Sequence, residues 1–301
     1  MTKVKTDRRT ALKNISLGIG AVSFGGMVLQ ACEDKKDKQS VSSSEMRLKG
    51  NINHSACRWC YQDIPLSEFA TAAKEMGLKA IDLLQPDEWQ IVTDAGLQCS
   101  LATDTFASIK NGFNTPEHHE NLQKQYYTLI SKAADAGIQQ VILFSGNSNG
   151  ISDETGWEHC ATGLDPLVKH AEKNNITLVM ELLNSKVDHA DYQCDHTPWG
   201  VALVDKIGSP NFKLLYDIYH MQIMEGDVIA TIKKYKDYIA HYHTGGVPGR
   251  NEINASQELN YPAIMRAVVA TGFSGYVAQE FIPTYDDKLK ALKEGITICD
   301  V

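Results

Sequence analysis

The sequence predicts an α/β fold, a (β/α)8 TIM barrel in which eight parallel strands alternate with helices. Two observations support this prediction. Short runs rich in Val, Ile and Leu recur eight times after residue 50, and stretches with helical spacing of apolar residues lie between them. Continuous apolar runs are typical of parallel strands that are buried on both faces. Eight such strands in about 250 residues match the usual size of this barrel.

The expected strands are short, and each follows a turn that contains Gly, Asn or Asp, residues that favour turns. An open, doubly wound sheet is the alternative arrangement for such strands. The chain contains no G-x-G-x-x-G or phosphate-loop motif, either of which would favour that alternative. The eight expected strands cover residues 51–55, 80–84, 98–103, 140–144, 177–182, 213–218, 239–243 and 276–281.

The expected helices have apolar residues at helical spacing, and several end beside a glycine, the usual residue after a helix. Gly77 and Gly137 directly follow two of them, and Gly272 lies close behind the last. The seven expected helices cover residues 66–76, 87–94, 119–136, 165–173, 198–207, 227–235 and 261–270.

The first residues have the order of an export signal. The paired arginines Arg8 and Arg9 precede a weakly apolar stretch, residues 15–29, and the sequence Leu-Gln-Ala-Cys then ends at Cys32. Paired arginines before a weak apolar region are typical of a twin-arginine signal, and the ending resembles a bacterial lipobox, whose cysteine receives a lipid. A chance cysteine after a secretory signal is the alternative.

We therefore expect residues 1–31 to be a twin-arginine, lipoprotein-type signal and Cys32 to be the lipidation site. The protein would then be exported and held in the periplasm or cell envelope, with an N-terminal lipid anchor in the membrane. Residues 32–49 are charged and rich in Ser, a composition that does not bury enough apolar surface to fold. We expect them to be a disordered tether, and residues 50–301 to form the barrel domain.

Composition and charge exclude several classes of protein. The 301 residues include 29 Lys and Arg against 37 Asp and Glu, for a formal net charge of −8, and 43% are hydrophobic. An acidic chain lacks the positive surface that a general nucleic-acid binder needs, so no nucleic-acid partner is expected. No apolar run of about 20 residues is present, so no ordinary membrane-spanning helix is expected. A homo-oligomer is compatible with the sequence.

The cysteines do not by themselves identify a site. Cys57 and Cys60 form a C-x-x-C pair, which occurs in redox and zinc sites, but no second such pair completes a zinc site. We interpret them as ordinary thiols near the end of the first strand. The seven cysteines are residues 32, 57, 60, 99, 160, 194 and 299.

Polar residues at the ends of the last four expected strands point to chemistry. Glu181, Asp217, His243 and Glu280 end strands five to eight, and the active site of such a barrel lies at the C-terminal ends of its strands. Three carboxylates and one imidazole form a hard, oxygen-rich ligand set that suits Mn²⁺ or Mg²⁺, with Co²⁺ or Zn²⁺ as alternatives. His241 shares a strand face with His243 and is the alternative imidazole ligand.

Other polar residues lie near the same expected strand ends and are candidates for binding the substrate. His220 follows the second ligand by three residues, and Arg250 ends a Gly-rich loop after the third. Asn147 follows strand four, Lys186 follows the first ligand, and His54 lies at the end of strand one. Trp59, Tyr61 and Phe106, near the ends of strands one and three, would stack on a sugar ring or else pack beneath loops.

These motifs resemble those of the xylose isomerase-like barrel superfamily, and within it those of hydroxypyruvate isomerases and ketose 3-epimerases. The resemblance covers about residues 50–285, and its motifs lie mainly in the second half. It implies a barrel with one divalent metal ion, the four ligands named above, and His220 and Arg250 as residues that hold substrate oxygens. The matching motifs are Met-Glu-Leu-Leu-Asn at 180–184, Asp-Ile-Tyr-His-Met-Gln at 217–222, His243, Val-Pro-Gly-Arg at 247–250, and Gln-Glu at 279–280.

The expected activity is isomerisation or epimerisation of a small sugar, keto-sugar or keto acid through a metal-stabilised enediolate. Glu181 and Glu280 would be the catalytic acid and base on the two sides of the substrate. His243 favours the epimerases, because the hydroxypyruvate isomerases have Gln at this ligand. Two other functions remain open: a metal-dependent hydrolase or nuclease on the same barrel, and a sugar-binding lipoprotein without catalysis.

Overall fold

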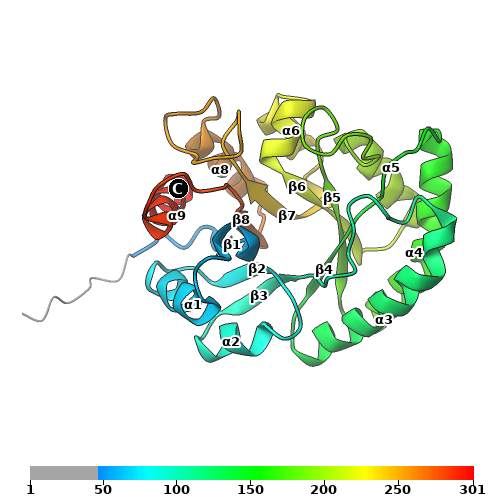
Figure 1. Cartoon of the computed structure of the whole chain (residues 1–301). Helices are drawn as coiled ribbons and strands as arrows, with labels where there is room; N and C mark the ends of the chain where they lie inside the picture. Colours follow the sequence, from blue (N-terminus) through cyan, green and yellow to red (C-terminus); the bar gives the residue numbers. More distant parts are fainter. Residues whose placement is uncertain (1–46) are drawn as a thin grey trace, which may run out of the picture. The chain divides into compact units, whose positions relative to one another are not determined.

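The computed structural model describes residues 47–301, which form a barrel of eight strands surrounded by helices (Figure 1). Neighbouring strands pair in parallel, in the order β1-β8-β7-β6-β5-β4-β3-β2. The predicted barrel and all eight strand positions are confirmed. The strands are β1 (Asn53–Ala56), β2 (Ala80–Leu84), β3 (Gln98–Ala102), β4 (Gln140–Leu143), β5 (Thr177–Leu182), β6 (Phe212–Asp217), β7 (Ile239–Thr244) and β8 (Tyr276–Gln279).

The barrel closes where β1 meets β2. The amide of Lys79 donates to the carbonyl of His54 at 2.9 Å, and Cys57, directly after β1, forms an isolated parallel bridge with Asp82 of β2. The side chain of Asp82 is fully buried. The carboxylate of Asp82 is therefore buried inside the barrel, at the junction between β1 and β2.

Helices cover the outside of the strands, as expected for βα units. Apolar side chains of both layers are buried against one another, so the core lies between strands and helices as well as inside the barrel. The α-helices within residues 47–301 are α1 (Leu66–Glu75), α2 (Trp89–Asp94), α3 (His119–Asp135), α4 (Asp153–Lys173), α5 (Thr197–Ile207), α6 (Ile218–Met224), α7 (Val228–Lys234), α8 (Tyr261–Ala270) and α9 (Lys288–Cys299). Three short 3-10 helices are η1 (Arg58–Tyr61), η2 (Pro116–His118) and η3 (Lys236–Tyr238).

Helix α4 begins well before the predicted residue 165. Asp165 followed by Pro166 has the sequence of a helix start, because proline suits the first turn. In the structure Pro166 lies inside the helix, and the true start is capped by Ser152, whose side chain accepts from the amide of Thr155. The prediction was therefore twelve residues late.

Helices α6 and α9 were not predicted. Helix α6 has seven residues and follows β6 without a loop, so it shows no helical repeat of its own. Asp217 ends β6 and also caps α6, with Oδ1 accepting from the amides of Tyr219 and His220 at 2.8 and 3.2 Å. Helix α9 is capped by Asp287 and packs its buried face against the rest of the barrel.

The two ends of the described chain lie together. The amide of Lys49 donates to the carboxylate of Asp300 at 3.0 and 3.1 Å, and the side chain of Asn51 donates to the carbonyl of Val301 at 2.8 Å. The predicted signal, the lipidation site Cys32 and most of the predicted tether lie outside the described residues. Among residues 47–301, no helix is long and apolar enough to cross a membrane.

The cysteines of the described chain are buried and carry free thiols. Cys57 and Cys60 are among them, so the C-x-x-C pair is not a disulfide in this structure. Burial is the largest cause that raises the pKa of both thiols. Both thiols lie in the interior, and Cys57 is beside the site described next, with Sγ 3.8 Å from Nε2 of His243.

Candidate active site

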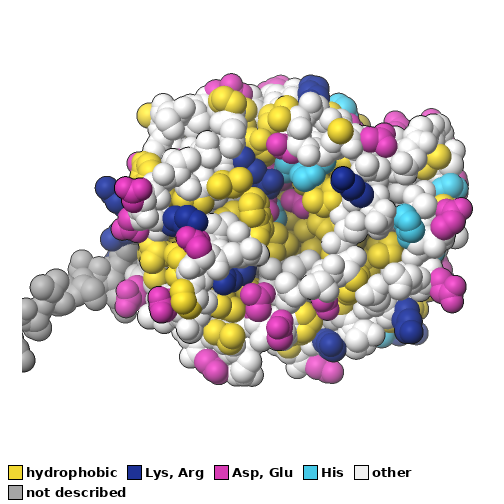
Figure 2. Space-filling view, in the orientation of Figure 1, with side chains coloured by type: hydrophobic (Ala, Val, Ile, Leu, Met, Phe, Trp, Pro, Cys, Tyr) yellow, Lys and Arg dark blue, Asp and Glu magenta, His cyan; other side chains and the backbone are white. Residues whose placement is uncertain are grey.

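The four predicted ligand residues meet at the mouth of the barrel. Glu181 lies on β5, Asp217 ends β6, His243 lies on β7 and Glu280 directly follows β8. One ligand atom from each lies within 4.8 Å of those from the other three, and all four side chains are buried. Figure 2 shows Asp, Glu, His and basic side chains gathered around a hollow at the centre of this face.

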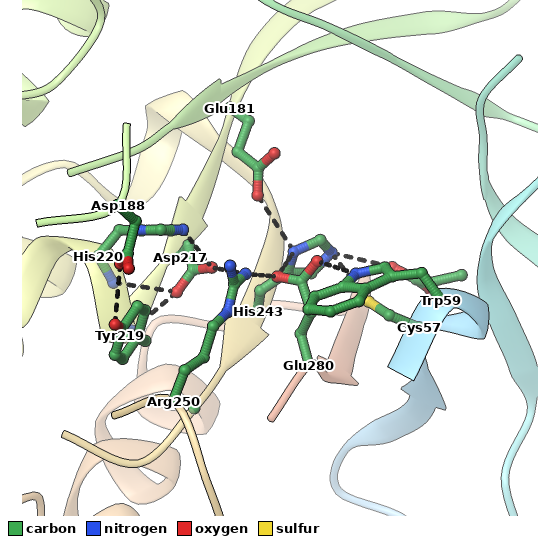
Figure 3. A network of polar contacts seen from close by, with 12 residues as sticks. Cys57, Trp59, Glu181, Asp188, Asp217, Tyr219, His220, His243, Arg250 and Glu280 are labelled. Atoms are coloured by element: carbon green, nitrogen blue, oxygen red, sulfur yellow. Dashed lines mark hydrogen bonds and ion pairs between the residues drawn. The ribbon is translucent and has the colours of Figure 1, made fainter. Parts of the chain in front are cut away.

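The imidazole of His243 is central to this cluster (Figure 3). Its Nδ1 lies 2.7 Å from Oε2 of Glu280 and 3.3 Å from Oε1 of Glu181. The guanidinium of Arg250 lies on the other side, with Nη2 at 2.5 Å from Oε2 of Glu280 and 3.1 Å from Oδ2 of Asp217. One imidazole and one guanidinium thus face three carboxylates.

The donor set fits a divalent cation. Oε1 of Glu181 and Nδ1 of His243 are buried and point toward the centre of the cluster. Their contacts are short, but neither atom makes a hydrogen bond of regular geometry. Burial, the largest cause, and the neighbouring Glu280 raise the pKa of Asp217 to about 8, and Arg250 only partly opposes them. Burial likewise raises the pKa of Glu181. A divalent cation would relieve this conflict, because it stabilises the ionised carboxylates that burial disfavours.

Glu280 differs from the other two carboxylates. Burial opposes its ionisation, but Arg250 and His243 outweigh burial and hold its pKa well below the ordinary value. The indole Nε1 of Trp59 also donates to Oε1 of Glu280 at 2.8 Å. Glu280 is therefore an ionised carboxylate with both oxygens engaged.

A fourth buried carboxylate, that of Asp82, contacts His243 from deeper in the barrel. Oδ2 of Asp82 lies 3.1 Å from Nε2 of His243 and 2.5 Å from Nε2 of His241. Burial opposes the charge, but Glu280 and Asp82 hold the pKa of His243 well above its ordinary value, so both ring nitrogens carry hydrogen in the metal-free chain. A bound cation would displace the hydrogen of Nδ1, which faces Glu181 and Glu280, while Nε2–H donates to Asp82. A carboxylate behind a ligating histidine fixes the ring in this way in metal sites. The structure therefore places His243 at the site and His241 below it.

Asp82 is itself held on every side. The hydroxyl of Ser55 donates to Oδ1 at 2.7 Å, and Ser100 donates to the same oxygen. Burial disfavours the charge, yet His241 and His243 hold the pKa of Asp82 below its ordinary value. Nδ1 of His241 in turn lies 2.8 Å from Oε1 of Gln140. The barrel thus contains an ordered polar chain that ends at His243.

His220 lies at the mouth, as predicted. It sits in the first turn of α6, and its Nε2 is 3.6 Å from Oδ2 of Asp217. Its Nδ1 is 2.6 Å from the amide nitrogen of Asn184. Burial, followed by the nearby charge of Arg250, holds the pKa of His220 well below its ordinary value, so the ring is neutral.

Two aromatic rings flank Arg250. Its guanidinium carbon is 5.3 Å from the ring centres of both Trp59 and Tyr219. Arg250, predicted as a substrate-binding residue, is thus fixed at the edge of the cluster. Tyr61 and Phe106 do not join it: Tyr61 stacks on Phe69, and Phe106 packs edge-on against another core ring, so both pack under loops.

The prediction for His54 was wrong. Side chains alternate along a strand, and Ser55 points into the barrel toward Asp82, so the neighbouring His54 points outward. Its Nε2 lies 3.8 Å from Asp300 at the C-terminus. His54 is a buried residue between the barrel and the terminal segment rather than a substrate ligand.

Lys186 has partners within the protein, and its predicted contact with substrate stays a prediction. Its ammonium donates to the carbonyls of Ile223 and Met224 at 3.0 and 2.9 Å, and these carbonyls lie at the C-terminus of α6. Such carbonyls attract cations because they lack helical partners. For Asn147 the structure gives main-chain contacts: its amide donates to Lys110 and it forms an isolated bridge with Tyr192. These main-chain contacts join the loops around Asn147. No contact of the described residues places its side-chain amide group in the mouth.

Sequence reasoning missed four residues that shape the site. Asn184 and Tyr219 lie inside motifs quoted from the sequence, but the motifs gave these two residues no role. Asp82 and Asp188 lie outside those motifs, and only the folded barrel brings them near the cluster. Asp82 lies inside an apolar strand run, where an unexplained carboxylate is itself unusual and was the one available signal. The missed residues are Asp82, Asn184, Asp188 and Tyr219.

A model of the xylose isomerase-like TIM barrel family matches residues 61–298. The chain belongs to this family. The match spans nearly all of the barrel, including the four ligand positions. The resemblance noted in the sequence motifs is therefore confirmed at the level of the family.

Several curated members of the family are isomerases. The chain is 32% identical over 111 residues to the hydroxypyruvate isomerase of Escherichia coli, with 37% of this chain and 42% of that protein covered. It is 33% identical over 113 residues to the 2-oxo-tetronate isomerase of Cupriavidus necator, covering 38% and 43%. With the 2-oxo-tetronate isomerase of Pectobacterium atrosepticum the identity is 23% over 236 residues, covering 74% and 88%.

Solved structures of the family share the fold. A protein from Brucella melitensis described as an AP endonuclease of family 2 has a TM-score of 0.72 at 21% identity, covering 80% of this chain and 97% of that chain. The 3-keto-D-glucoside 4-epimerase of E. coli has a TM-score of 0.69 at 18% identity, covering 82% and 98%. At these identities the likeness extends to the barrel and does not by itself select one reaction.

Proposed function

We propose that this family member is a divalent-metal-dependent isomerase or epimerase of a small sugar or keto acid. The observation that carries the proposal is the convergence of Glu181, Asp217, His243 and Glu280 within 4.8 Å at the barrel mouth. The isomerase relatives favour the same class of reaction. Mn²⁺ or Mg²⁺ suits this ligand set best.

The residues of the site account for a proton transfer beside a carbonyl group. A cation held by the four ligands would supply Lewis-acid stabilisation of negative charge on the substrate oxygens. Glu181 and Glu280 approach from β5 and from the end of β8, so one removes the proton from carbon while the other returns a proton to the neighbouring position. Arg250 and His220 hold substrate oxygens beside them.

The two basic side chains predicted to bind substrate already have partners within the protein. The guanidinium of Arg250 is already paired with Asp217 and Glu280. The ammonium of Lys186 is bound to carbonyls at the end of α6. A substrate carboxylate would therefore depend on the bound cation as its charge partner, whereas an uncharged sugar or keto-sugar needs no such partner.

Exchange of carbon-bound protons tests the proposal directly. Residues 45–301 with Mn²⁺ would be incubated in D₂O with hydroxypyruvate, aldoses, ketoses and 3-keto-sugars, and the proton signals followed by NMR. We expect deuterium to enter beside the carbonyl of a sugar, and EDTA to abolish this exchange. Absence of exchange in every substrate, in a protein shown to hold metal, would contradict the proposal and favour a binding protein.

Glu280→Gln is the matched variant for this experiment. It keeps the size of the side chain and removes the proton carrier, so we expect folded protein with turnover reduced by several orders of magnitude. Wild-type turnover would exclude Glu280 from catalysis.

We further propose that the protein is exported by the twin-arginine route and anchored through lipid on Cys32. The support is the order Arg8-Arg9, apolar stretch, cysteine in the sequence. Labelling cells with a radioactive fatty acid tests the anchor: label on the wild type and none on Cys32→Ala is expected. Replacing both arginines by lysine should retain the unprocessed chain in the cytoplasm.

A further inference from the structure

The side chain of Asn184 has one orientation that its contacts allow. Asn184 lies two residues after β5, and its Oδ1 accepts from the main-chain amides of Val187 and Asp188, both at 3.0 Å. A main-chain N–H only donates, so the atom that receives both bonds is the oxygen. The NH₂ group of Asn184 therefore points to the opposite side, toward α6.

Both hydrogens of that NH₂ group have acceptors. Nδ2 of Asn184 lies 2.6 Å from Oδ2 of Asp188 and 2.6 Å from Nδ1 of His220. An amide NH₂ has no lone pair to offer, so Nδ1 of His220 is the acceptor in this contact. A histidine whose Nδ1 accepts carries its hydrogen on Nε2 and is neutral.

The remaining nitrogen of His220 faces the barrel mouth. Nε2 is buried and has no hydrogen-bond partner among the described residues, and Oδ2 of Asp217 lies 3.6 Å from it (Figure 3). Asp217 already uses Oδ1 to cap α6. The Nε2–H is thus a donor beside the ligand cluster that makes no hydrogen bond within the described residues.

We propose that Asn184 is the positioning residue that keeps His220 neutral with its hydrogen on Nε2, so that the ring holds a substrate oxygen as a donor. The assignment deepens the proposed function and rests on it for the substrate. A fixed N–H stabilises the negative charge that develops on oxygen when a neighbouring C–H proton leaves. The proton goes to a glutamate carboxylate, and His220 keeps its own hydrogen throughout.

Nitrogen NMR of the folded protein, loaded with diamagnetic Mg²⁺ and labelled with ¹⁵N-histidine, reads the tautomer. A His220→Gln variant identifies the signals. We expect a protonated Nε2 and an unprotonated Nδ1 for His220 in the wild type. A hydrogen on Nδ1, with or without one on Nε2, would overturn the assignment.

Asn184→Asp reverses the polarity of the contact. Aspartate keeps Oδ1 for the two main-chain amides and replaces the donor NH₂ by an acceptor. Combining it with Asp188→Asn conserves the charge and the hydrogen bond between the two side chains. In this double variant we expect the hydrogen of His220 to move to Nδ1. We expect kcat to fall about a hundredfold, which is the order of effect when one oxyanion donor is removed. KM should change much less.

Asp188→Asn alone is the control, because it leaves the amide of Asn184 facing His220 and should leave the tautomer unchanged. An unshifted His220 signal in the double variant overturns the role of Asn184, and a shifted signal with undiminished kcat overturns the role of His220. A wild type with the expected tautomer but no proton exchange in any substrate would instead contradict the proposed function.

Discussion

His243 is held between two carboxylate environments, and each nitrogen of its ring has a separate task. Nε2 faces the buried Asp82, while Nδ1 faces Glu181 and Glu280. Asp82 touches none of the other ligands in these contacts, so its effect on the site passes through the ring of His243. This makes Asp82 a residue whose removal tests orientation separately from ligation.

We expect Asp82→Asn to weaken Mn²⁺ binding by about 10- to 100-fold, the usual cost of losing such an outer partner. Asparagine keeps the shape but loses the charge that holds the tautomer of His243. Competition with a fluorescent chelator measures the affinity. Asp165→Asn, an exposed carboxylate paired with Lys169, is the control and should bind as the wild type does. Equal affinities for both variants would exclude the orienting role.

His54 gives the fold a dependence on pH. Burial, only partly opposed by Asp300, lowers the pKa of His54 to about 4. The unfolded chain binds a proton near pH 6.5 and the folded chain does not, so stability is complete above that pH and falls as the pH drops toward 4. At 1.36 kcal/mol per pKa unit, the loss attributable to His54 is about 3 kcal/mol.

Urea denaturation between pH 7 and pH 4 measures this loss. His54→Leu cannot take up a proton, so the free energy of unfolding should decline less steeply for the variant than for the wild type. Parallel declines would show that His54 is not the group responsible.

At the scale of elements, the strands were predictable and the helices only in part. Strand positions follow from continuous apolar runs such as 177–182, since burial on both faces leaves a strong signal. Helix α6 has seven residues and depends on Asp217 at the end of β6, so its signal is not periodic. Helix α4 contains Pro166, which has the sequence signature of a helix start although the helix continues through it.

The early start of α4 is open to a stability test. Ser152 accepts from the amide of Thr155 and caps the first turn, so Ser152→Ala should lower the free energy of unfolding by about 1 kcal/mol. Ser152→Asp retains a capping oxygen and should preserve stability. If alanine and aspartate behave alike in urea denaturation, the helix does not depend on this cap.

On the scale of the whole molecule, the candidate site was also predictable from the sequence only in part. The convergence of the four candidate ligands at the ends of strands five to eight was predictable, because one barrel rule places all of them at one mouth. Asp82 and Asn184 were not, since each reaches the site only through a contact between segments far apart in the chain. The prediction for His54 was wrong because successive residues of a strand face opposite sides, so His54 points away from the barrel interior that Ser55 faces.

In the metal-free barrel, the buried carboxylate of Glu181 at the mouth lowers the free energy of unfolding, and a bound cation would offset this loss. Burial and the neighbouring Glu280 raise the pKa of Glu181, so its ionised form destabilises the metal-free fold at neutral pH. Glu181→Gln removes this charge. In EDTA at pH 7 we expect the variant to unfold at a higher urea concentration than the wild type.

Mn²⁺ should reverse that order. A ligand that binds only the folded state at 100 times its Kd adds about 2.7 kcal/mol to stability. The wild type should gain an amount of this order, and Glu181→Gln much less, because it lacks one of the four ligands. Thermal melting with and without Mn²⁺ provides the comparison. Equal gains for both proteins would place the cation elsewhere, and a variant less stable than the wild type in EDTA would show that Glu181 stabilises the metal-free fold.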